Sequence, residues 1–162
     1  MNEVLFTPWR LAYLQGMGAP AEGACLFCAL QKHDDEAALI VHRGVTAYVV
    51  LNRFPYTNGH LMIVPFAHRG RLAEMTVAER SDMIELASRC ETYLTEEYRP
   101  HGLNVGWNLG RAAGAGVADH AHLHVVPRWD GDTNFLTVTG GTRTVPEELL
   151  VTRRRLATRF GA

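Results

Sequence analysis

The segment from His120 to Pro127 constrains the fold more than any other part of the chain. It reads His-Ala-His-Leu-His-Val-Val-Pro, so histidines alternate with apolar residues. Side chains alternate between the two faces of a β-strand, which places His120, His122 and His124 on one face at intervals of roughly 7 Å. The apolar residues then face a core. Stacked imidazoles suppress one another's protonation, which keeps at least one ring neutral and nucleophilic near neutral pH.

Four other segments have the composition of β-strands. They are rich in Val, Ile, Leu and Tyr and are separated by turn-forming residues. These segments span residues 38–42, 45–51, 60–64 and 103–108. Arg43 and Gly44 separate the first two as a hairpin break would, so these two strands should pair antiparallel.

Two segments have the pattern of helices. Thr76 and Glu79 have the spacing of a capping box, and the apolar residues beyond them recur at intervals of three and four up to Leu94. A second helix is expected from Pro146 to Phe160. We therefore predict an α+β fold, with a five-stranded antiparallel sheet, one long helix and a C-terminal helix.

Length and charge limit the class of protein. The 162 residues fit one domain with a core of its own. We expect an N-terminal arm over 1–24, a core over 25–130 and a C-terminal extension over 131–162. The 16 basic and 17 acidic residues give a net charge of -1, which does not favour bulk attraction to nucleic acid or to an anionic membrane. Any anion must therefore be held by local groups.

Three further features indicate a cytoplasmic protein. The chain has no apolar run near the ~18 residues of a membrane span. Its first residues lack the basic and apolar regions of a signal peptide. Its three cysteines, an odd number that includes Cys25 and Cys28, fit a reduced compartment better than a disulfide framework. The third, Cys90, falls on the apolar face of the long helix and is expected in the core.

The histidine segment resembles the motif of the histidine triad family of nucleotide hydrolases and transferases. Other residues that match in order and spacing are Asn52, Gly59-His60, His68 and the loop from Asn108 to His120. The resemblance covers residues 25 to 130. The flanking segments at 7–10 and 124–135 and the Cys25-Leu-Phe-Cys28 pair are similar to the bacterial branch of diadenosine tetraphosphate phosphorylases.

This resemblance implies a covalent mechanism on the histidine strand. His122, the middle histidine, would attack the α-phosphorus of a nucleotide and form a nucleotidyl-imidazole intermediate. His124 would orient His122 by a hydrogen bond that fixes its tautomer. His120 and His60 complete the set of catalytic candidates, and His60 is either a wall residue or a direct phosphate contact. Water as the acceptor gives hydrolysis, and inorganic phosphate gives phosphorolysis.

The resemblance also implies a nucleotide site. Asn52 matches a position that binds ribose hydroxyls, since an amide both donates and accepts hydrogen bonds, although it is equally a common turn former. Asn108 and the backbone of the loop from Gly110 to Gly116 are candidates for binding phosphate oxygens. Many members carry Ser, Thr or Gln near the position of Gly116. Because this chain has glycine there, the resemblance leaves open whether water or phosphate resolves the intermediate.

A metal site is implied beside the histidines. The spacing of Cys25 and Cys28 suits metal ligands, and zinc-bearing relatives supply the other two from the positions of His68 and His120. Such a closed site would hold structural Zn²⁺. The alternative is that both cysteines are free thiols and that His120 only forms a hydrogen bond in the sheet.

The leading interpretation is a homodimeric enzyme, with the long helix and the central strand as contacts. It would cleave dinucleoside polyphosphates, with phosphorolysis of diadenosine tetraphosphate preferred. The alternatives are a nucleoside phosphoramidase or general nucleotide hydrolase, a binding module that holds nucleotides without turnover, and a zinc-sequestering protein that uses the three histidines as ligands.

Overall fold

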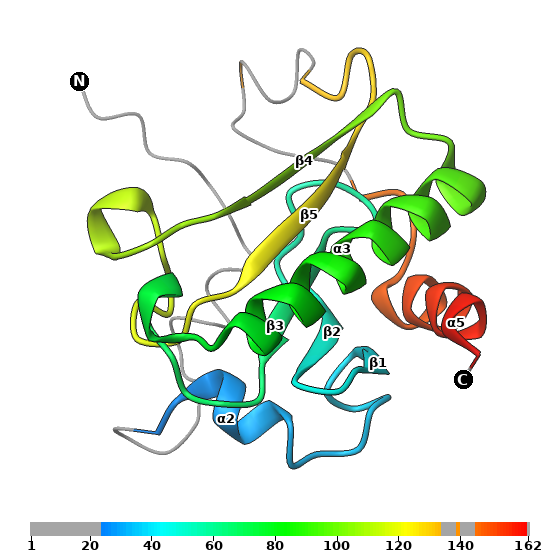
Figure 1. The fold of residues 1–162 in the computed structure, drawn as a ribbon. Coiled ribbons are helices and arrows are strands. Elements are labelled where there is room, and N and C mark those ends of the chain that lie inside the picture. Colours follow the sequence, from blue (N-terminus) through cyan, green and yellow to red (C-terminus); the bar gives the residue numbers. More distant parts are fainter. Residues whose placement is uncertain (1–23, 134–138, 140–144, 162) are drawn as a thin grey trace.

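The computed structural model describes residues 24–133, 139 and 145–161 (Figure 1). The arm predicted over 1–24 lies outside these residues except for Ala24. The segment at 7–10, which resembles the bacterial phosphorylase branch, also lies outside them. Within the described part of the chain, no helix combines the length and apolar character that a membrane span requires.

A five-stranded antiparallel sheet forms the centre of the fold, as predicted. The strands are β1 (Ile40–Arg43), β2 (Ala47–Leu51), β3 (Leu61–Pro65), β4 (Gly102–Trp107) and β5 (Leu123–Arg128). They stand in the order β1-β2-β3-β5-β4, and every neighbouring pair is antiparallel. Because β5 is inserted between β3 and β4, the strand that carries His124 has a partner on each side.

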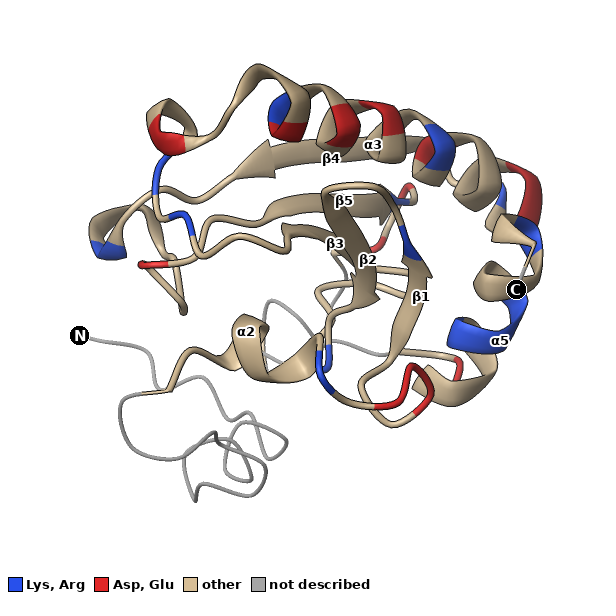
Figure 2. Cartoon of the chain, turned by 60° about the horizontal axis from the view of Figure 1, so that its bottom comes forward, with Lys and Arg blue, Asp and Glu red and all other residues tan. Residues whose placement is uncertain are grey.

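The long helix α3 (Val77–Tyr98) packs against β2, β3 and β5 (Figure 1). It begins with the predicted capping box: the Thr76 hydroxyl accepts from the Glu79 backbone, and the Glu79 carboxylate accepts from the Thr76 backbone. Cys90 is fully buried in the core, as expected. Arginines are interspersed with Asp and Glu along α3 (Figure 2).

The C-terminal helix α5 (Leu149–Phe160) contacts β1 and α3. It was predicted to begin at Pro146, but it starts three residues later. Glu147 explains the shift, because its carboxylate accepts hydrogen bonds from the hydroxyls of Tyr98 and Thr152 and holds the chain in a non-helical approach. At the other end, the Phe160 ring stacks on His42 with ring centres 4.6 Å apart.

The start of β5 also differs from the prediction. The strand begins at Leu123 and not at His120, because Leu123 is the last residue paired with both β3 and β4. Ahead of it, the Ala121 amide donates to the carbonyl of Arg69 in the loop after β3. His120 and His122 therefore precede the regular strand, and both are as buried as the apolar residues beside them.

Candidate active site

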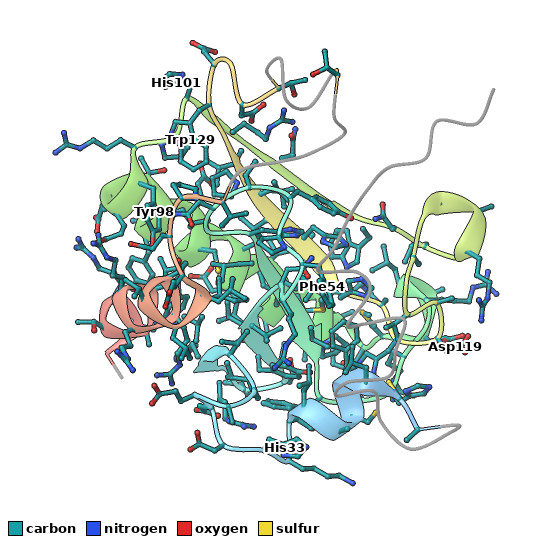
Figure 3. The ribbon with its side chains drawn as sticks, turned by 180° about the vertical axis from the view of Figure 1, so that it is seen from behind. His33, Phe54, Tyr98, His101, Asp119 and Trp129 are labelled. Carbon is teal, nitrogen blue, oxygen red and sulfur yellow. The ribbon has the colours of Figure 1, made fainter. Side chains whose placement is uncertain are left out.

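The three histidines form a line of ring contacts at the start of β5. The Phe27 ring lies 5.5 Å from the ring of His120 and 4.8 Å from that of His122, centre to centre. The His122 ring lies 4.9 Å from that of His124. In Figure 3, Asp119 marks the end of this segment next to His120, and Trp129 marks the far end of β5. The alternation in the sequence thus brings the three rings into one continuous site.

One hydrogen bond fixes the tautomer of His122. Its Nδ1 lies 2.9 Å from the carbonyl oxygen of His120. A carbonyl can only accept, so Nδ1 carries the proton, and in the neutral ring the lone pair is on Nε2. Burial lowers the pKa of His122 below its ordinary value, and the bond to the carbonyl opposes this only in part. The ring therefore has the form of a nitrogen nucleophile.

A second chain of hydrogen bonds fixes His60 and His124. The backbone amide of Tyr56 donates to Nδ1 of His60 at 3.1 Å, so the proton of His60 is on Nε2. That Nε2 lies 2.9 Å from Nδ1 of His124, which must accept. The proton of His124 is therefore on its Nε2, which is buried and has no hydrogen-bond partner among the described residues.

His124 does not orient His122 in the predicted way. The two rings touch edge to face, but Nδ1 of His122 is already bonded to the carbonyl of His120. Nδ1 of His124 instead faces His60, which directly precedes the neighbouring strand β3. Burial and the nearby His122 lower the pKa of His124 to about 4, so this ring is neutral. Its free N–H suits it to donate a hydrogen bond to a ligand.

Asn52 is the first residue of a series of hydrogen bonds that runs through His60 to His124. Its Oδ1 accepts from the Phe54 amide at 3.0 Å, which is the turn-forming geometry, and its Nδ2 lies 3.3 Å from Nδ1 of His60. Phe54 lies over the sheet in the view from behind (Figure 3). The amide of Asn52 is thus engaged at both ends within the protein.

A cavity of about 340 Å³ opens beside His124. Its lining comes from β4, β5 and the segments that follow β2, β4 and β5, and consists of Tyr56, Thr57, Asn104, Val105, Gly106, Trp107, Asn108, His124, Val126, Arg128, Asp132 and Thr133. Of the residues predicted to bind phosphate, Asn108 lies here. Gly110 instead lines a separate cavity with His68 and Asp119, and Gly116 lines neither of these two cavities.

The loop after β4 has a backbone that requires glycine. Gly110 and Gly114 flank the short 3-10 helix η2 (Arg111–Ala113) with φ of 83° and 90°. Side chains other than glycine rarely adopt such values. Gly116 is exposed.

The four predicted metal ligands come together next to His120. The ligand atoms of Cys25, Cys28, His68 and His120 all lie within 4.8 Å of one another. Nδ1 of His120 is 3.3 Å from the sulfur of Cys25, and Nδ1 of His68 is 3.4 Å from that of Cys28. Nε2 of His120 donates to the carbonyl of Pro65 at 2.9 Å, which leaves the lone pair of His120 on the side of the thiols. Two sulfurs and two imidazole nitrogens are a donor set that suits Zn²⁺.

Comparison with known proteins gives the family. A family model described as the HIT domain matches residues 34–131. The chain belongs to the HIT family. A protein of Mycobacterium tuberculosis (strain H37Rv) named AP-4-A phosphorylase is 41% identical over 162 residues, which covers 96% of this chain and 83% of that protein.

Other HIT proteins are more distant. An adenosine 5'-monophosphoramidase of Schizosaccharomyces pombe is 27% identical over 65% of this chain and 74% of its own length. A Zn-bound histidine triad family protein from Mycobacterium smegmatis, known as a crystal structure, is 26% identical with a TM-score of 0.67, and the match covers 85% of this chain and 94% of that one. These relatives confirm the predicted family and fold.

Two residues whose rings contact the candidate histidines were not identified in the sequence analysis. Phe27 lies on the five-residue helix α2 (Leu26–Leu30), and its carbonyl accepts a hydrogen bond from the Tyr48 hydroxyl at 2.9 Å. Its position between Cys25 and Cys28 was the available signal, because a cysteine pair that meets His120 brings the intervening residue to the histidines. Tyr56, whose ring lies 6.0 Å from that of His124, carried no signal beyond its place in the loop before His60.

Proposed function

We propose that this HIT protein transfers a nucleotidyl group from a dinucleoside polyphosphate to His122 and then to inorganic phosphate. The hydrogen bond from Nδ1 of His122 to the carbonyl of His120 carries this proposal, because it leaves Nε2 as a free nucleophile in a neutral ring. The 41% identity to a protein named AP-4-A phosphorylase favours diadenosine tetraphosphate as the substrate.

The first step is an in-line displacement. The lone pair on Nε2 of His122 attacks the α-phosphorus, and the bond from that phosphorus to the bridging oxygen breaks. The electron pair leaves with the oxygen of ATP. The ring then carries a positive charge, which the bond from Nδ1–H to the carbonyl of His120 stabilises. We assign to His124 the donation of its Nε2–H to a non-bridging oxygen as negative charge develops there, and the lack of a partner for this N–H among the described residues supports the role.

The second step regenerates the enzyme. An oxygen of inorganic phosphate attacks the adenylylated ring, the N–P bond breaks, and ADP leaves as His122 recovers its lone pair. We assign to Asn52 the positioning of His60 and contact with the ribose of the retained nucleotide, and to Asn108 contact with the phosphates. Asn108 lines the cavity beside His124, which supports its role.

Product analysis tests this function. Incubation with diadenosine tetraphosphate and inorganic phosphate is expected to yield ADP and ATP in equal amounts. ATP with AMP, independent of phosphate, would show hydrolysis instead. Nucleotide binding without any product, measured by calorimetry, would show a binding module and overturn the proposal.

We infer that Cys25, Cys28, His68 and His120 bind one Zn²⁺ with a structural role. A four-coordinate ion of this kind holds protein segments together and leaves no position open for a substrate. The donor set and the free lone pair of His120 support this site. Two reduced thiols in a metal site also fit a cytoplasmic location.

Replacing Cys28 with serine is expected to remove the metal. Elemental analysis should find one zinc per chain in the wild type and less than a tenth of that in the variant. A ligand that binds only the folded state stabilises it, so the free energy of unfolding should fall by about 2 kcal/mol or more, or roughly 4–8 °C in Tm.

The control for this experiment is Cys90→Ala, which removes a cysteine that lies outside the metal site and should keep its zinc. His122→Ala should also keep the metal. Loss of zinc from His122→Ala would instead support direct metal binding by the three histidines.

We further infer a homodimer. The long helix and the central strand stay the predicted contacts, and the structure adds a third candidate, because β4 lies at the edge of the sheet. Val105 on β4 and Leu109 beyond it are 52% and 42% exposed. An edge strand with exposed apolar residues is a common site for pairing with a second chain.

A further inference from the structure

The cavity beside His124 is a groove along β4 and β5, and its lining includes Asn104, Gly106, Val126 and Arg128. Residues paired across antiparallel strands point to the same face. Gly106 pairs with His124, Asn104 with Val126 and Gly102 with Arg128. A Cβ added to Gly106 or to Gly102 would meet nothing within 4 Å. The space above β4 is therefore open from His124 to Arg128.

Arg128 closes the far end of this groove in a fixed orientation. Its Nε and Nη2 donate to the two carboxylate oxygens of Asp132 at 2.6 and 2.8 Å, and its Nη1 donates to Oδ1 of Asn104 at 2.8 Å. The side chain is nevertheless 44% exposed. An arginine at the surface is ordinarily mobile, whereas these three bonds hold the guanidinium plane in one orientation.

The bonds also determine which ligand Arg128 suits. Asp132 neutralises the positive charge and occupies the edge of the guanidinium that would otherwise bind a phosphate in bidentate fashion. What remains open is the flat face. Guanidinium faces stack on aromatic rings, and stacking on nucleobases is one of their common uses. The pair therefore favours a base over a phosphate.

The position of Arg128 is consistent with a ligand that is bound at two separated points. Arg128 lies four residues beyond His124 on the same face, which corresponds to about 13 Å along a strand. Asn52 lies on the opposite side of β5, at the end of β2. A nucleotide held on the Asn52 side would thus direct its phosphate chain past His122 and over β4.

We propose that the groove over β4 binds the leaving nucleotide and that its base stacks on the guanidinium of Arg128. This inference rests on the proposed function, since it assigns the second nucleoside of a dinucleoside polyphosphate. Asn104 and Asp132 are positioning residues for Arg128. Such a site favours substrates with a nucleoside at both ends.

The test compares two substrates with the same phosphate chain. Diadenosine tetraphosphate carries the second nucleoside, whereas adenosine 5'-tetraphosphate lacks it, and phosphorolysis releases ADP from both. For Arg128→Leu we expect kcat/KM to fall about tenfold for diadenosine tetraphosphate, through the loss of stacking, and to stay within about twofold for adenosine tetraphosphate. Arg128→Lys keeps the charge but has no flat face. It should therefore show the same loss as Arg128→Leu, confined to diadenosine tetraphosphate.

Asn104→Ala frees one corner of the guanidinium and should produce a smaller loss, again confined to the dinucleotide. The matched control is Arg154→Leu. Arg154 is an exposed arginine on α5 that forms an ion pair with Glu36, and its replacement should leave kcat/KM unchanged for both substrates. Thermal melting checks that each variant folds. If Arg128→Leu does not fold, the comparison of the two substrates is made with Arg128→Lys.

Equal losses on both substrates, or no loss on either, would overturn the inference while leaving the proposed function intact. Failure of the wild type to release ADP from either substrate would instead contradict the proposed function itself.

Discussion

Replacement of His122 by alanine is expected to lower kcat by about four orders of magnitude or more, because a covalent nucleophile has no substitute in the site. The ring of His60 is bonded to His124, and the ring of His120 faces the thiols of the metal cluster. Neither can present a free nitrogen at the position of Nε2 of His122. The rate is measured by ADP release from diadenosine tetraphosphate under saturating phosphate.

The covalent intermediate gives an independent readout for His122. Quenching the wild type during turnover of a substrate labelled in the α-phosphate should trap label on the protein through an acid-labile bond, and His122→Ala should trap none. His101→Ala is the matched control, since His101 is exposed and lies at the other end of the sheet (Figure 3). Activity within tenfold of the wild type would refute the role of His122.

The second large effect is expected for His124→Phe, which should lower kcat by about two to three orders of magnitude. This substitution keeps a ring of similar size but removes the unpartnered N–H of a histidine that lines the cavity. A donor that meets charge developing in the transition state contributes this much in comparable sites. Phenylalanine also leaves Nε2 of His60 without its acceptor.

His124→Gln separates the two contributions, since glutamine can place an amide N–H at a similar reach. It should recover at least tenfold of the activity lost in the phenylalanine variant. The outcome that contradicts the donor role is a rise in KM with kcat unchanged in both variants, because that pattern indicates uniform binding and not stabilisation of the transition state.

Local sequence patterns were sufficient for most of the fold. The capping box at Thr76 and Glu79 and the apolar periodicity of α3 depend on neighbours within one helical turn, so they can be read directly. The start of β5 could not be read in this way. It is set by where β3 and β4 stop pairing, at Leu123, and such a limit depends on residues far apart in the chain.

The candidate site divides along the same line. Spacing and resemblance together indicated the four residues of the metal cluster, which the structure brings within ligand distance. Spacing and resemblance could not give the proton positions on the rings, because these depend on contacts made in the folded chain. Nδ1 of His60 accepts a hydrogen bond from the Tyr56 backbone, and Nε2 of His60 donates one to His124. The helix α2 was missed because five residues are too few for a helical period to show.

The neutrality of the histidines has a consequence for how the protein meets a highly charged substrate. In the cavity beside His124, the charged lining residues are Arg128 and Asp132, which neutralise each other. In the proposed function, a polyphosphate is therefore received by N–H dipoles and not by ammonium or guanidinium charges. Ionic strength, which weakens attraction between free charges, has little to act on in such a site. Affinity then depends on how well the donors fit the phosphate oxygens.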